Sequence, residues 1–120
     1  IAACHMEAHG PDWPQIAALY DSLLRFEPTA VVRLNRAVAY GEAQSAELGL
    51  RMIEDLGRDL ADYQPYHAVR AAMLSRNGMI AAALEAYDTA LTMTNSIADA
   101  GFLSRKRSEL ASKANQASNS

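Results

Sequence analysis

The sequence predicts an all-α fold of about seven helices that pack as antiparallel pairs. Apolar residues recur at spacings of three and four along most of the 120 residues, and strand-like alternation does not recur as a regular feature. Six Gly and four Pro are few for a turn-rich all-β chain. Half of the residues are hydrophobic and 21% are charged, which excludes an intrinsically disordered protein. A chain of this length needs neither a metal nor a disulfide to fold.

The first expected helix covers residues 1–9 and is stopped by a Gly-Pro pair. Asp12 is a suitable N-cap for the second helix, with Pro14 in the first turn and Gln15 three residues after the cap. Pro28 closes this helix. Its apolar stripe comprises Ile16, Leu19, Tyr20, Leu23 and Leu24.

Thr29 is expected to cap a third helix that runs to about Tyr40. Because Gly41 follows, we expect this helix to end early. Ser45 is the expected cap of a fourth helix, and residues 57–64 form a loop. The spacing of Gly41, Gly49 and Gly57 indicates helix punctuation. The stripe of the fourth helix comprises Leu48, Met52, Ile53 and Leu56.

Pro65 is expected to start a fifth helix, which ends at a turn formed by Asn77-Gly78. A sixth helix follows from Ile80 to about Met93. Ser96, with a carboxylate three residues later, is the expected cap of a seventh helix. Residues 112–120 are small and polar, so the sequence predicts a domain over residues 1–111 and a disordered tail.

The segment from residue 66 to 95 resembles a tetratricopeptide repeat, a helix pair of 34 residues. Small residues let two helix backbones approach, and an aromatic fills the gap between layers. The closing proline of the repeat is replaced by Asn95, and residues 16–28 and 34–56 match more loosely. We therefore expect two or three degenerate repeats in a right-handed superhelix, the alternative being a generic Ala-rich bundle. The series that carries the match is Gly78, Ala83, Tyr87 and Ala90.

Four runs give the chain a more specific resemblance, and the second and third of them are the most distinctive. It resembles, from residue 1 to about 110, the C-terminal extension of bacterial extracytoplasmic-function (ECF) sigma factors that carry a tetratricopeptide-like domain. The resemblance implies an alternative sigma factor of RNA polymerase, whose promoter-reading and polymerase-binding regions lie upstream of Ile1. The runs are Ile-Ala-Ala-Cys-His (1–5), Asp-Trp-Pro-Gln-Ile-Ala-Ala-Leu-Tyr-Asp (12–21), Val-Val-Arg-Leu-Asn-Arg-Ala-Val-Ala (31–39) and Tyr-His-Ala-Val-Arg-Ala (66–71).

The resemblance implies a regulatory domain that modulates transcription initiation through protein contacts, with the upstream sigma regions, RNA polymerase or both as partners. Promoter DNA is contacted only through those upstream regions. A formal charge of −3 agrees, because free nucleic-acid binding usually requires a basic surface. We expect no enzymatic activity, no cofactor and no membrane span. Two alternatives remain: a stand-alone adaptor that holds a peptide, and a small-molecule sensor or enzyme.

Five residues are candidates for partner binding. Asn35 falls near a position where some tetratricopeptide domains hold a peptide carboxylate, and Arg33, Arg36 and Arg70 are the available cations. An arginine can hold a carboxylate through two parallel hydrogen bonds. His67, early in the fifth helix, could face the same groove, the alternative being a packed or half-exposed histidine. The alternative interpretation is that Asn35 braces its helix and the arginines are solvated.

The remaining features favour structural interpretations. A single cysteine, Cys4, cannot form an internal disulfide, which favours a reducing cytoplasm. Cys4, His5 and His9 could approach one metal ion, but a solvated helix end is the simpler interpretation. Trp13 is expected to pin the second helix to its neighbour. Residues 105–107, Arg-Lys-Arg, are expected to form a solvated face of the last helix.

Overall fold

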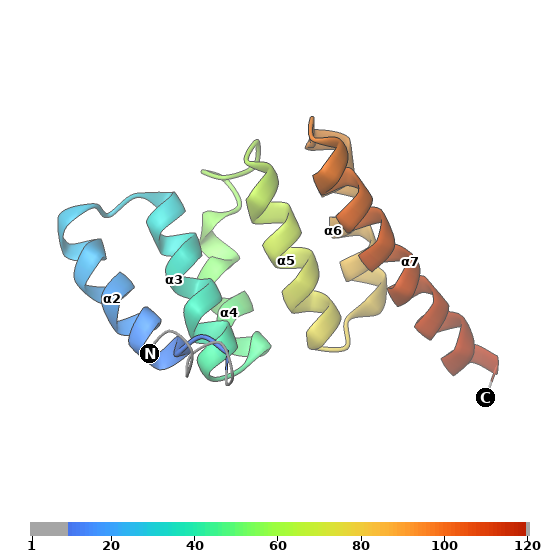
Figure 1. Ribbon diagram of the computed structural model, residues 1–120, viewed down its shortest axis with the longest axis horizontal. Helices are drawn as coiled ribbons and strands as arrows, with labels where there is room; N and C mark the ends of the chain where they lie inside the picture. The colour runs from blue at the N-terminus through green and yellow to red at the C-terminus, as the bar shows by residue number, and fades with distance from the viewer. Residues whose placement is uncertain (1–9, 120) are drawn as a thin grey trace.

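The computed structural model describes residues 10–119, which form six α-helices and one short 3-10 helix with no strand among them (Figure 1). The all-α prediction is confirmed. The first of the seven expected helices falls on residues 1–9, outside the described part of the chain. The elements are α2 (Trp13–Phe26), α3 (Ala30–Ala43), α4 (Ala46–Ile53), the 3-10 helix η1 (Glu54–Leu56), α5 (Gln64–Arg76), α6 (Ile80–Met93) and α7 (Ile97–Asn119).

The helices run in alternating directions and follow one another across the molecule in chain order, from α2 at one end to α7 at the other (Figure 1). Each packs chiefly on its neighbours in sequence, and α3 also contacts α5. In Figure 1, α4 and α6 lie behind α3, α5 and α7. The molecule is therefore elongated, with extents of 46 × 36 × 28 Å.

Four helices, α2, α3, α4 and α7, start where the sequence predicts because their caps form. The side chains of Asp12 and Thr29 accept hydrogen bonds of 3.2 Å from the backbone N–H groups of Gln15 and Val32. Ser45 caps α4 in the same way at 3.1 Å, and Ser96 accepts from the N–H of Asp99 at 3.2 Å. Each bond satisfies a backbone donor that a helix terminus leaves unpaired.

The third helix is longer than the sequence predicts. It continues through Gly41 to Ala43, and Gly41 is buried. The reason is a close helix crossing: a Cβ placed on Gly41 would lie 3.4 Å from Cε of Met73 in α5, and one on Gly49 in α4 only 2.8 Å from the same atom. These glycines allow three helices to meet, so their interpretation as helix punctuation was wrong.

The C-terminal end also differs from the prediction. Helix α7 continues to Asn119, past residue 111 where the sequence predicted that order ends. Residues 112–119 contain no Gly or Pro, and half of them are Ala, Lys or Gln, which are good helix formers. A polar composition therefore did not prevent helix formation here.

Buried apolar side chains form two clusters, and Leu50 of α4 packs against both. The first joins α3, α4, η1 and α5. The second joins α5, α6 and α7, and it contains Ala83, Tyr87 and Ala90, the series that suggested the repeat. Gly78 supplies the preceding turn with a φ of +80°. The first cluster contains Leu34, Ala37, Ile53, Leu56, Leu60, Tyr66 and Met73; the second adds Ala71, Leu74, Ala86, Leu103 and Leu110.

Candidate functional site

An open groove of about 540 Å³ lies between α4 with η1 and α5. Its volume lies within the range of roughly 300–1,000 Å³ that is usual for ligand sites. One wall comes from α4 and η1, the other from α5 and the turn before α6. The lining residues are Leu50, Arg51, Ile53, Glu54, Gly57, Tyr66, His67, Arg70, Leu74 and Met79.

Tyr66, one of the lining residues, is buried at the start of α5. Its backbone N–H donates to the carbonyl of Tyr63 at 3.1 Å, and Pro65 occupies the first turn. A Cβ on Gly57 would lie 3.1 Å from the Tyr66 hydroxyl oxygen, so the loop approaches the ring closely because this residue is glycine. The ring of Tyr66 thus packs in the core beside Gly57, a contact that the sequence did not reveal.

His67 is held in a defined orientation on the α5 wall. Its Nε2 lies 2.7 Å from the carbonyl oxygen of Ala61, and its ring meets that of Tyr66 edge-to-face with centroids 5.1 Å apart. Because a carbonyl can only accept, Nε2 carries the proton in this bond. In the neutral ring, Nδ1 is then an acceptor.

Arg70 lies one helical turn after His67 on the same wall, and it is half-buried. No carboxylate within residues 10–119 forms an ion pair with it. On the opposite wall, Arg51 is 3.5 Å from Glu47 and 70% exposed, so its pairing is weak. Glu54 is the only carboxylate among the lining residues. The lining therefore contains two cationic side chains and one carboxylate.

A separate polar cluster joins α2 to α3. The Asp21 carboxylate accepts hydrogen bonds from the Tyr40 hydroxyl at 2.5 Å and from Nε of Arg36 at 2.6 Å, and the Arg36 guanidinium lies 5.0 Å from the centre of the Tyr40 ring. The bond from Tyr40, followed by that from Arg36, lowers the pKa of Asp21. The same bond to Asp21, with burial next, raises the pKa of Tyr40. Arg36 is therefore occupied within the fold.

The structure brings together two of the five candidate residues. His67 and Arg70 line the groove, whereas Arg36 faces α2 and Arg33 and Asn35 are exposed on α3 away from the groove lining. Asn35 therefore does not brace a helix interior. Three further residues line the groove without having been predicted from the sequence: Arg51, Glu54 and Met79. The spacing of three between Arg51 and Glu54 was the available signal, but nothing in the sequence showed which helix faces them.

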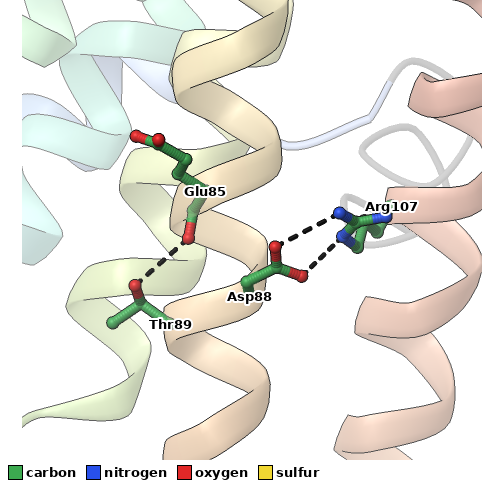
Figure 2. Close-up of polar contacts among 4 residues, drawn as sticks. All are labelled: Glu85, Asp88, Thr89 and Arg107. Atoms are coloured by element: carbon green, nitrogen blue, oxygen red, sulfur yellow. Dashed lines mark hydrogen bonds and ion pairs between the residues drawn. The ribbon is translucent and has the colours of Figure 1, made fainter.

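In the basic run at residues 105–107, Arg105 and Lys106 are exposed as predicted, whereas Arg107 is half-buried. Nε and one terminal nitrogen of Arg107 donate to the two oxygens of Asp88, at 2.5 and 3.2 Å, and so tie α7 to α6 (Figure 2). Arg105 and Lys106 lie 6.0 and 5.7 Å from the centre of the Phe102 ring. Arg107 thus ties α7 to α6, and the other two cations of the run lie near an aromatic ring.

Two further predictions concern metals and membranes. Cys4, His5 and His9 lie outside the described residues, and residues 10–119 contain no group of three His, Cys, Asp or Glu side chains placed to hold an ion. No helix in that part of the chain is long and apolar enough to cross a bilayer.

Trp13 is half-buried at the start of α2.

Comparison with known proteins finds a relative but no established family. The chain is 36% identical, over 116 residues, to an uncharacterized protein of Rhizobium meliloti (strain 1021). The similarity covers 94% of this chain and 27% of the relative, so the chain spans about a quarter of the length of the curated relative it matches. No family model matches the sequence, and no solved structure matches it.

Proposed function

We propose that the chain is the regulatory extension of a bacterial ECF sigma factor, that it acts in the cytoplasm, and that it modulates transcription initiation by RNA polymerase. The observation that carries the proposal is the resemblance of residues 12–21 and 31–39 to the extension of these factors. The similarity of the chain to one quarter of a longer protein agrees with a part that works beside other domains.

Residues of the same two runs cap or pack their helices, and this supports the repeat fold that the proposal includes. Asp12 and Pro14 begin α2, and Leu34 and Ala37 of α3 are buried in the first cluster. With alternating helices and the buried Ala83–Ala90 series, they favour tetratricopeptide-like pairs in a right-handed superhelix. A stack of this kind presents an extended surface for another protein chain.

In the proposed mechanism, the domain packs on the sigma core or on polymerase and shifts the population that can bind a promoter. A domain can shift such an equilibrium only if it binds one state better than the other. The partners are therefore the upstream regions of the same protein, polymerase, or both.

The test compares intact protein with a truncated form that lacks residues 1–120, in transcription reconstituted from purified polymerase and promoter DNA. The expected result is a several-fold change in transcript yield at a responsive promoter. Equal polymerase binding by both forms separates regulation from misfolding of the sigma core. Unchanged output at every promoter would contradict the proposal, as would an intact reading frame without promoter-binding regions upstream of Ile1.

The groove between α4 and α5 favours a second candidate, a stand-alone adaptor that holds a peptide. The specific observation behind this alternative is Arg70, which is half-buried and forms no ion pair with a carboxylate of residues 10–119. The same reading frame distinguishes the two, because an adaptor has no promoter-binding regions.

A further inference from the structure

We infer that a second pocket, lined by residues of α5, α6 and α7, binds a phosphate group, with the buried Tyr87 as one of its hydrogen-bond donors. This pocket shares no lining residue with the groove between α4 and α5. The inference goes beyond the proposed function because it gives the domain a small-molecule ligand, and it does not depend on the assignment to a sigma factor.

The first argument is the state of Tyr87, a core residue of α6 that also lines this pocket. Tyr87 is 5% exposed, and its hydroxyl forms no hydrogen bond with any of the described residues. No fully buried side-chain oxygen or nitrogen among those residues lacks a partner, so the Tyr87 oxygen must be reached from outside, and the pocket is the opening that it lines. A nearly buried donor without a protein partner is stabilised by an acceptor on a ligand.

The protonation of this hydroxyl suits a donor. Burial, followed by the charge of Glu109, raises the pKa of Tyr87, so the hydroxyl keeps its proton at neutral pH. The side chain therefore donates to an anion instead of repelling it.

The second argument is that three helices bring donors to the same pocket. Ser75 of α5 contributes a half-buried residue with a hydroxyl, and Lys106 and Lys113 of α7 contribute ammonium groups. Neither lysine forms an ion pair with a carboxylate of residues 10–119. A phosphate group has three strong acceptor oxygens that point in different directions, and lysine is a common phosphate ligand. Donors from three sides therefore match a phosphate better than a planar carboxylate.

The charges of the lining, counted with their existing partners, also favour an anion. Three cations and one carboxylate line the pocket: Arg76, Lys106, Lys113 and Glu109. Arg76 is already bonded to Glu42, which lies outside the lining, at 2.5 Å, so those two charges cancel. The two lysines and Glu109 leave a net charge of +1. A phosphate monoester carries about 1.5 to 2 negative charges at neutral pH, so it is attracted to this lining.

The size of the pocket restricts the rest of the ligand. Its volume is about 200 Å³. Drug-sized ligands usually occupy roughly 300–1,000 Å³, so this pocket suits free phosphate or a monoester with few further atoms. Glu109 can accept a hydrogen bond from a hydroxyl group of such an ester.

The test is isothermal titration calorimetry of the whole chain with glycerol 3-phosphate, inorganic phosphate and acetate. Both phosphates should bind saturably with a Kd of about 1 mM or lower, and acetate roughly tenfold more weakly or not at all. Tighter binding of the ester identifies a small phosphorylated molecule as the source of the group, whereas equal binding identifies free phosphate. The absence of saturable binding by either phosphate, or acetate binding as tight as theirs, would overturn the inference.

Tyr87→Phe separates a ligand contact from a structural role. Because the hydroxyl has no partner among the described residues, its removal should leave the unliganded protein as resistant to urea as the wild type. Phosphate binding should weaken roughly tenfold, since a hydrogen bond to a charged group is lost. The matched control is Tyr63→Phe, which removes a hydroxyl at a residue 37% exposed and outside the pocket, and which should bind phosphate as the wild type does.

Exposed positions of α7 provide a second set of variants that should not disturb the core. Lys113→Gln should weaken phosphate binding several-fold, whereas Arg105→Gln removes the same charge outside the lining and should have little effect. Glu109→Gln should strengthen binding, because it removes the carboxylate that repels the anion. Wild-type affinity in both Tyr87→Phe and Lys113→Gln, or equal losses in Lys113→Gln and Arg105→Gln, would overturn the assignment of this pocket.

Discussion

Two helix interfaces of the molecule, α5–α6 and α2–α3, are stabilised by different interactions. Between α5 and α6, the small side chains Ala71, Ala83 and Ala90 are each 0% exposed, and Tyr87 fills the space beside them. Between α2 and α3, the α2 side buries only Ala17 among the described residues, and the helices share the Asp21, Arg36 and Tyr40 cluster.

The difference predicts how each interface responds to change. Close packing of small residues depends on volume and is insensitive to pH, whereas hydrogen bonds to an ionised carboxylate depend on protonation and salt. On α2, Leu19 is 63% and Phe26 81% exposed and one side chain, Ala17, is buried, whereas α6 buries four side chains. We therefore expect α2 to separate from the fold under conditions that leave α5–α6 intact.

The largest expected effect tests the apolar interface. Ala83→Leu inserts three carbon atoms where the side chain is 0% exposed, and it should lower the free energy of unfolding by about 1–3 kcal/mol through overpacking. Urea denaturation followed by circular dichroism measures this. The control is Ala81→Leu, an exposed position of the same helix, which should change stability by less than about 0.5 kcal/mol. Equal stability of the two variants would show that α5 and α6 are not closely packed.

A smaller effect tests the polar interface. Asp21→Asn should lower stability at neutral pH by about 1 kcal/mol, because the carboxylate is partly exposed and its bonds are partly screened. The folded pKa of Asp21 lies below its ordinary value of 3.8, so its contribution is present above that pH and is lost as the pH falls below it. The stability difference between wild type and Asp21→Asn, measured by urea denaturation over a pH series, should therefore shrink below pH 3.8. A difference that stays constant on acidification would contradict the role of the charge.

The smallest effect concerns the alkaline side. The folded pKa of Tyr40 is raised above its ordinary value of 10.0, so its hydroxyl stabilises the fold below that pH and the contribution is lost as the pH rises further. Tyr40→Phe should cost roughly 0.5–1 kcal/mol at neutral pH and should approach wild-type stability above pH 10. Thermal unfolding over an alkaline pH series measures this. Tyr87, whose pKa is raised by burial and then by Glu109, titrates in both proteins and serves as the internal reference.

Most helix starts could be predicted because their causes are local. A capping side chain acts on the N–H three residues later, as at Thr29 and Ser45, and proline restricts only its own turn. The extent of α3 could not be predicted in this way. Gly41 stops a helix or permits a crossing according to what lies opposite, and Met73 lies thirty-two residues further along the chain.

The candidate site was predictable only in part for a related reason. The sequence indicated that arginines and a histidine could serve a partner, and it placed His67 and Arg70 on one helix. Whether an arginine is free depends on which carboxylate lies across the helix interface. Asp21 reaches Arg36, while no carboxylate of the described chain reaches Arg70.

By itself, the sequence determined the all-α class, the cap of each helix from α2 to α4 and of α7, and the small and aromatic residues of α6 that pack in the core. These properties arise from interactions within a few residues or from periodicity along one helix. Only the tertiary structure decided that two glycines form a crossing, that Arg36 and Arg107 tie helices together, and that Arg70 lines an open groove. Each of these depends on groups distant in sequence that become neighbours only when the helices stack.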